Sequence, residues 1–184
     1  TLFPYTTLFR SKSRDILVDA HEKNIAIISL TYNGDIMASA TEMGTIIRIF
    51  DTDNGSLLKE VRRGKEKASI KYICFDESNI LMAASSNRGT VHIWSVASNL
   101  KSNEEKEKTK DKDNKIELSE KQENEEIKKI QNRKSFLSVI PNIFGDFFNS
   151  EWSFAQVRIK DPNTICCFGD DNTIIIVGIN GIYY

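Results

Sequence analysis

The feature that most constrains the fold of this chain is an internal repeat of about 45 residues. Residues 28–51 read ISLTYNGDIMASATEMGTIIRIFD, and residues 73–96 read ICFDESNILMAASSNRGTVHIWSV. Each copy runs from an apolar segment through a turn and a Met-Ala segment to a Gly-Thr pair. A β-branched run that ends in an aromatic residue follows. This period is typical of β-propeller blades, each of which is a sheet of four strands.

Turn signals support an all-β fold, because Asn33-Gly34, Asn54-Gly55 and Asn180-Gly181 each favour a hairpin between apolar runs. We predict a WD40-like β-propeller of which this chain is a fragment, with two blades and part of a third, since four to eight blades are usually needed to close the ring. Such a fragment exposes apolar blade faces, so we expect it to fold poorly alone. The predicted strands lie near 25–31, 36–41, 45–50 and 57–62, then near 69–75, 80–85, 90–96 and 152–159, with a third, degenerate copy at 164–184.

The first eleven residues, TLFPYTTLFRS, match the translation of a common short-read sequencing adapter. We therefore interpret residues 1–11 as an artefact and leave them out of the fold. We expect the natural protein to begin further upstream.

Composition excludes several classes of function. The net charge of −1 over 184 residues argues against a nucleic-acid binder or a general binder of anionic membranes. Cys74, Cys166 and Cys167 show no paired spacing, so we expect a reducing cytoplasmic setting with no disulfide framework and no metal site. No nucleophile–base pair or phosphate-binding glycine loop is present, so we predict neither an enzyme nor a cofactor.

A long insert, residues 97–151, separates the third and fourth strands of the second blade. Its segment 101–134 has 11 basic and 10 acidic residues, a net charge of +1, and we expect disorder there, with a solvent-exposed helix as the alternative. Segment 135–150 places its apolar side chains on one half of a helical wheel. That face needs a membrane, a partner or the propeller itself to cover it. Its members include Phe136, Leu137, Ile140, Ile143, Phe144, Phe147 and Phe148.

Candidate binding residues surround the adjacent pair Arg62-Arg63. Successive side chains of a strand point to opposite faces, so the two arginines are expected to serve two different pockets. Guanidinium, hydroxyl and imidazole groups suit a phosphate ligand. The alternative is that these groups form structural networks inside the blades. The first blade offers His21, Thr41, Thr45 and Arg48, and the second offers Ser86, Thr90 and His92.

The segment VRRG, residues 61–64, resembles the Phe-Arg-Arg-Gly signature of the PROPPIN family, with Val61 in place of Phe. The stretches DAHEKNI, SATEMGTIIRIFD, ASSNRGTVHIW and NSEWSFAQVRI also resemble that family, although Met43 stands where members often have Lys. PROPPINs are seven-bladed propellers that bind polyphosphoinositides and act in autophagy. The resemblance implies that residues 12–96 hold blade five and three strands of blade six, and that residues 152–184 complete blade six and begin blade seven.

By position, the resemblance implies one headgroup pocket made of His21, Thr41, Thr45, Arg48 and Arg62. It implies a second made of Arg63, Ser86, Thr90 and His92. The family's lipids are phosphatidylinositol 3-phosphate and phosphatidylinositol 3,5-bisphosphate, and its long blade-six loop enters the bilayer. We therefore expect a peripheral membrane adaptor on phagophore, endosomal or vacuolar-type membranes that works with autophagy proteins. The rival hypothesis is a WD-repeat protein-interaction scaffold without a lipid site. If the histidines face phosphate, binding should strengthen as the pH falls through about 6.5.

Overall fold

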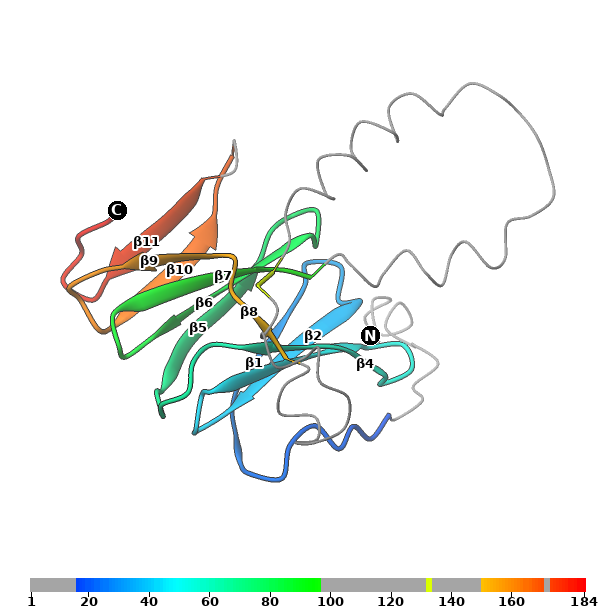
Figure 1. Ribbon diagram of the computed structural model, residues 1–184. Coiled ribbons are helices and arrows are strands. Elements are labelled where there is room, and N and C mark those ends of the chain that lie inside the picture. Colours follow the sequence, from blue (N-terminus) through cyan, green and yellow to red (C-terminus); the bar gives the residue numbers. More distant parts are fainter. Residues whose placement is uncertain (1–15, 97–131, 134–149, 171–172) are drawn as a thin grey trace, which may run out of the picture.

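The computed structural model has three sheets, whose strands are antiparallel except for one short parallel pair in the first sheet (Figure 1). The structure describes residues 16–96, 132–133, 150–170 and 173–184. The expectations for residues 1–11, for the charged segment and for the seven apolar residues between 136 and 148 fall almost entirely outside these ranges. All regular elements of the described residues are strands, so the predicted all-β class is confirmed. None of the described residues forms a helix long and apolar enough to cross a membrane.

The first two sheets arise from the two copies of the repeat, and the predicted strand positions agree with them to within a few residues. Strands β1–β4 form a meander in chain order, and β5–β7 form the same meander one repeat later. Strands β10 and β11 pair in a separate two-stranded sheet. The bounds are β1 Ile25–Leu30, β2 Ile36–Thr41, β3 Ile46–Asp51, β4 Leu57–Arg62, β5 Ile70–Phe75, β6 Leu81–Ser86, β7 Thr90–Ser95, β8 Glu151–Trp152, β9 Ala155–Arg158, β10 Thr164–Phe168 and β11 Ile174–Gly178.

The strand expected over 152–159 is divided into two strands that join different sheets. Strand β8 pairs in parallel with β4, at Val61↔Glu151 and Arg62↔Trp152, so it belongs to the first sheet. Strand β9 pairs antiparallel with β7 and completes the second sheet. The expectation of one continuous strand is therefore wrong, because the chain crosses from one sheet to the other between β8 and β9 (Figure 1).

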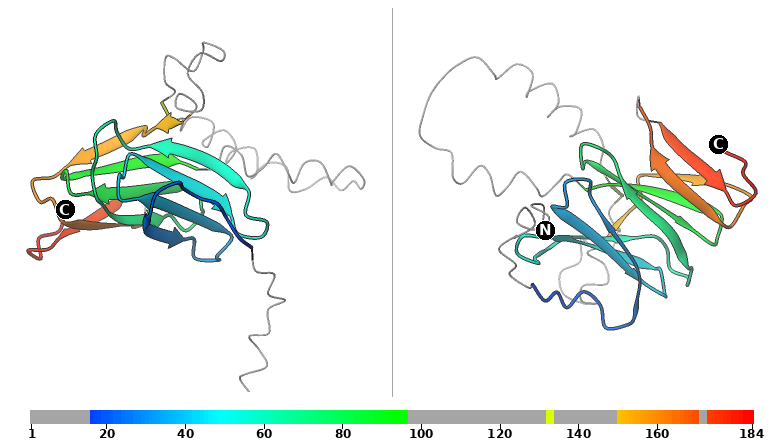
Figure 2. Two further views of the ribbon diagram at one scale, coloured as in Figure 1. Left: turned by 90° about the horizontal axis from the view of Figure 1, so that it is seen from below. Right: turned by 180° about the vertical axis from the view of Figure 1, so that it is seen from behind.

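Apolar side chains hold the sheets together. The main core includes Ile47 and Val61 from the first sheet and Ile70, Met82 and Trp94 from the second, all of them buried. A smaller core joins the second sheet to β10 and β11. Strand β1 packs against β5, and β5 in turn packs against β10, so the first strands of the three sheets are neighbours (Figure 2).

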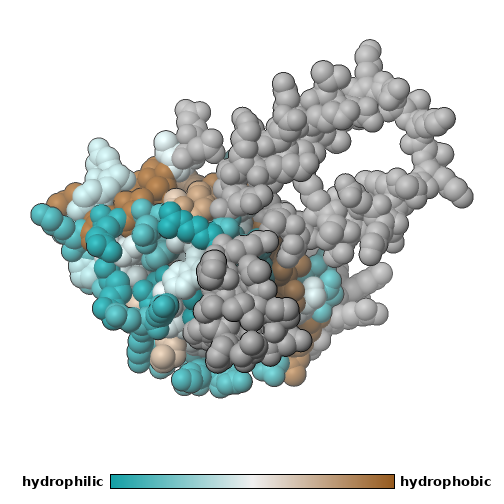
Figure 3. Space-filling view, in the orientation of Figure 1, coloured by the Kyte–Doolittle hydropathy of each residue, from teal (hydrophilic) through white to brown (hydrophobic). Residues whose placement is uncertain are grey.

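Exposed apolar side chains lie at both ends of this series of sheets. Ile28 and Leu30 of β1 are more than half exposed at one end, and Ile165 of β10 and Ile179 after β11 are exposed at the other. The region of β10 and β11, at the upper left of Figure 1, shows apolar surface in brown in Figure 3. Cys74 and Cys166 are free, with their Sγ atoms 3.8 Å apart across the second and third sheets.

The two Gly-Thr pairs of the repeat lie in equivalent tight turns. Gly44 and Gly89 adopt φ angles of 56° and 66°, in the left-handed region that favours glycine. A Cβ atom at Gly44 would overlap the carbonyl oxygen of Ala68, and one at Gly89 would overlap that of Ile159. In each blade the turn is therefore pressed against the backbone of a later segment, which explains why the repeat keeps glycine there.

We predict that Gly89→Ala lowers the free energy of unfolding by roughly 1–3 kcal/mol, because it adds backbone strain and a clash with a main-chain carbonyl. Urea unfolding followed by the fluorescence of the buried Trp94 measures the change. Gly64→Ala is the matched control, since its added Cβ would meet no atom within 4 Å. Equal stability of the two variants would contradict the prediction.

Candidate functional site

Adjacent arginines at the end of β4 reach different neighbours. Arg62 and Arg63 are only 4% and 7% exposed. The Nε of Arg62 donates to the hydroxyl of Ser150 at 2.9 Å. The Nε of Arg63 donates to the carbonyl of Gly44 at 2.8 Å, and one of its terminal nitrogens donates to the carbonyl of Glu66. Burial lowers the pKa of both guanidinium groups, although arginine stays protonated in proteins.

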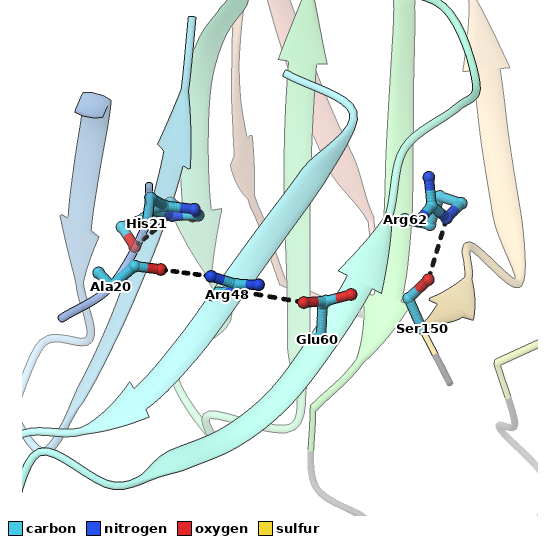
Figure 4. A network of polar contacts seen from close by, with 7 residues as sticks. Ala20, His21, Arg48, Glu60, Arg62 and Ser150 are labelled. Carbon is cyan, nitrogen blue, oxygen red and sulfur yellow. Dashed lines mark hydrogen bonds and ion pairs between the residues drawn. The ribbon is translucent and has the colours of Figure 1, made fainter. Parts of the chain in front are cut away.

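The Glu60 carboxylate of the first blade is bonded to Arg48, which in turn is bonded to the backbone beside His21 (Figure 4). Arg48 donates from Nε to Oε2 of Glu60 at 2.9 Å and from Nη1 to the carbonyl of Ala20 at 2.7 Å. His21 lies 3.0 Å from the hydroxyl of Ser39 through its Nε2. Burial, followed by the charge of Arg48, lowers the pKa of His21, and the Ser39 carbonyl and Glu60 act in the opposite direction.

Arg62 belongs to this same group, because the charge of Glu60 acts on it as well. The two threonines predicted for the first pocket flank the turn between β2 and β3. The carbonyl of Thr41 accepts the N–H of Gly44 at 2.9 Å, and the carbonyl of Thr45 accepts the backbone N–H of Arg63 at 2.9 Å. Glu60 is thus bonded to Arg48, and its charge acts on His21 and Arg62. The turn that contains the threonines is bonded to the neighbouring Arg63.

A second group forms around the equivalent turn of the second blade. Ser86 and Thr90 are direct partners across the β6–β7 pair. The Ser86 hydroxyl is buried and has no hydrogen-bond partner among the described residues. His92 lies 3.0 Å from the hydroxyl of Ser153 through Nδ1. Ser86, Thr90 and His92 thus lie together on β6 and β7, and the charge of Arg63 acts on His92.

Sequence reasoning missed Glu60, Ser150 and Ser153. Glu60 lies two residues before Arg62, and the period-two rule places both on the same face of β4, so its position could have been read from the sequence. The two serines come from the far side of the insert, and no local pattern connects them to the arginines.

A buried polar network links the two flanks of the insert to β4. Lys59 donates from Nζ to the carbonyl of Ser95 and to Oε2 of Glu151, both at 3.1 Å. Asn132 donates from Nδ2 to the same two acceptors at 2.7 Å and accepts the N–H of Ser95 at 2.8 Å. Arg133 and Trp152 exchange two backbone hydrogen bonds. The start and the end of the insert are therefore bonded to each other and to the strand that carries the arginines.

Repeated meanders of antiparallel strands, with their first strands adjacent, define a β-propeller architecture, here present in part. A family model described as PROPPIN matches residues 9–114, more than half of the chain. The chain belongs to the PROPPIN family.

The relatives and solved structures agree with this assignment. The chain is 30% identical over 167 residues to Autophagy-related protein 18e of Arabidopsis thaliana, which covers 90% of this chain and 37% of that protein. It is 30% identical over 148 residues to SVP1-like protein 2 of Candida glabrata, covering 79% of this chain and 32% of the relative. The structure of Kluyveromyces lactis Hsv2 superposes with a TM-score of 0.57 at 25% identity, over 88% of this chain and 40% of that one. The chain thus spans between 32% and 40% of the length of these relatives.

The environment of His92 gives a prediction about stability. Burial, followed by the charge of Arg63, lowers the pKa of His92 to about 4. Without a ligand, the His92 ring therefore gains its proton near pH 4 and not near pH 6.5. Between pH 6.5 and 4 the unfolded chain binds the proton and the folded chain does not, so stability falls as the pH falls through this window.

We predict that His92→Gln loses this pH dependence. At 1.36 kcal/mol per pKa unit, the contribution of His92 is up to about 3 kcal/mol of stability present above pH 6.5 and absent below pH 4. Urea unfolding of both proteins at pH 4.5, 5.5 and 7 isolates it as a difference, because the carboxylates are common to both. If the free energy of unfolding changed equally with pH in both proteins, the conclusion that His92 is buried and neutral would be contradicted.

Proposed function

We propose that this protein is a phosphoinositide-binding peripheral membrane adaptor that acts in autophagy. The observation that carries the proposal is the divergence of two adjacent buried arginines. The charge of Glu60, which is bonded to Arg48 of the first blade, acts on Arg62, whereas the charge of Arg63 acts on His92 of the second blade. One short motif can thereby supply a guanidinium group to each of two separate anion sites.

The chemistry of each group suits a phosphorylated inositol ring. A guanidinium group binds phosphate oxygens with two parallel hydrogen bonds, and hydroxyl groups satisfy the remaining lone pairs. The first site is proposed to use His21, Thr41, Thr45, Arg48 and Arg62, and the second Arg63, Ser86, Thr90 and His92. Ser86 supports the second site, because its buried hydroxyl has no partner in the described residues. The proposed ligands are phosphatidylinositol 3-phosphate and phosphatidylinositol 3,5-bisphosphate.

The insert is proposed to supply a third contact by placing the apolar side chains of segment 135–150 in the bilayer. The described residues beside it support this role, because Glu151 accepts from Lys59 of β4, the strand that ends at Arg62, and Asn132 donates to the same carboxylate. Headgroup sites and membrane contact are thus connected through one strand. Linked weak contacts gain avidity from effective concentration, so each site alone needs only modest affinity.

The cellular role is proposed from the names of the relatives, four of which are named Autophagy-related protein 18 or 18e. We propose an adaptor without enzymatic activity that is recruited from the cytoplasm to phagophore, endosomal or vacuolar-type membranes and contacts other autophagy proteins there. A WD-repeat scaffold without a lipid site is the alternative outcome of the first experiment below.

We expect Arg62→Thr/Arg63→Thr to abolish flotation with liposomes that contain phosphatidylinositol 3-phosphate, and each single variant to leave part of the binding. Arg62→Lys/Arg63→Lys keeps the charge but loses the planar fork, so it should bind weakly too. Liposomes in which phosphatidylserine supplies the same charge serve as the lipid control. Because both arginines are buried, thermal melting must first show that the variants are folded. Binding by the folded Thr variant at the level of the original protein would favour the scaffold.

A second experiment tests the insert. Phe144→Asp/Phe148→Asp should reduce retention on liposomes and leave binding of a soluble inositol phosphate unchanged, because a charged side chain opposes entry into the bilayer. Ser138→Asp/Asn142→Asp adds the same charge to the polar half of the helical wheel and is the matched control. Equal retention of both variants would show that this segment does not enter the membrane.

A further inference from the structure

The two blades differ in charge at one equivalent position of their last strands. Arg48 of β3 lies opposite Glu60 of β4 in the first blade. His92 occupies the repeat position of Arg48, and it lies opposite Gln156 of β9 in the second blade. A cationic residue facing a carboxylate in one blade is thus replaced by an imidazole facing a neutral amide in the other.

Glu60 holds a central place among the cationic residues of the first blade (Figure 4). Its carboxylate accepts a hydrogen bond from Arg48 at 2.9 Å, and the side chains of Glu60 and Arg48 are 16% and 33% exposed. The same charge acts on His21 and on Arg62.

Glu60 therefore cancels one of the two permanent positive charges of this site. With Arg48 and Arg62 positive and Glu60 negative, the group carries a formal charge of +1, by +2 − 1, when His21 is neutral. A phosphate that approaches Arg48 must compete with a carboxylate already bonded to the guanidinium group, and it meets like charge there. The cost grows with the number of phosphate groups on the ligand.

We infer that Glu60 is a specificity-determining residue that limits the first site to ligands of low negative charge, whereas Gln156 leaves the equivalent ladder position of the second site without a carboxylate. The inference rests on the proposed function, because it concerns the ligands of the same sites. It assigns to the two sites different preferences between singly and doubly phosphorylated headgroups. Position 60 in the first blade and position 156 in the second are then the points at which each preference is set.

The opposing role for Glu60 is to position Arg48 for the ligand. The two roles predict opposite changes in anion affinity when Glu60 is replaced by Gln. If Glu60 restricts the site, Glu60→Gln frees the guanidinium group, removes a like charge and strengthens anion binding. If Glu60 positions Arg48, the same change weakens binding of every anionic ligand.

The first experiment isolates the first site with Arg63→Thr and adds Glu60→Gln to it. Binding is measured by flotation on liposomes that carry either phosphatidylinositol 3-phosphate or phosphatidylinositol 3,5-bisphosphate. We expect Glu60→Gln to raise affinity for the bisphosphate by roughly three- to tenfold and for the monophosphate by less. Glu77→Gln makes the same change of net charge in the exposed turn between β5 and β6, and it should leave both affinities unchanged. A loss of affinity, or an equal gain for both lipids, would overturn the inference.

The reciprocal experiment installs the carboxylate in the other blade and does not depend on the folding of the Glu60 variant. Gln156→Glu is made with Arg62→Thr, which leaves only the second site. Since Gln156 is exposed, the change should be tolerated, and affinity for the bisphosphate should fall more than affinity for the monophosphate. Unchanged affinities would overturn the inference. Failure of the original protein to distinguish phosphoinositide from phosphatidylserine would instead overturn the proposed function, so the two failures are separable.

Discussion

The alternation of side chains along β4 is the constraint on which the rest of this structure depends. Val61 is fully buried in the core between the first two sheets, directly opposite Ile47 of β3. This contact fixes the register of the strand, because a slip of one residue would turn Glu60 and Arg62 into the apolar core. With Val61 anchored, Glu60 and Arg62 must lie on the opposite face. Packing in the core thereby decides where the charged groups stand.

Most of the fold could be predicted from the sequence because its determinants are local. The repeat spacing, the alternation of apolar residues and the turn glycines each act within a few residues, so they fixed the strands and the equivalence of the two blades. The division of the last strand into β8 and β9 could not be predicted, because it depends on contacts such as Arg62 with Ser150, which are 88 residues apart. For the same reason the sequence did not reveal Ser150 and Ser153, the hydrogen-bond partners of Arg62 and His92.

The two blades show how a duplicated unit can keep its backbone and change its chemistry. Gly44 and Gly89 make the same turn, each pressed against a later segment of main chain. Hydroxyl residues flank both turns. The ladder position that follows differs, with Arg48 opposite Glu60 in the first blade and His92 opposite Gln156 in the second. The backbone requirement therefore keeps the same turn geometry in both blades, and the side chains around the turn differ between them.

The polar network at the base of the insert also has a consequence for protein engineering. Asn132 and Arg133 on one side and Ser150 and Glu151 on the other are already bonded to one another or to β4. The ends that a replacement linker must join are thus held in place by the protein itself. A shortened variant suitable for crystallisation would join Arg133 to Ser150 and keep all four residues. A deletion that also took Glu151 would remove the carboxylate to which Lys59 is bonded.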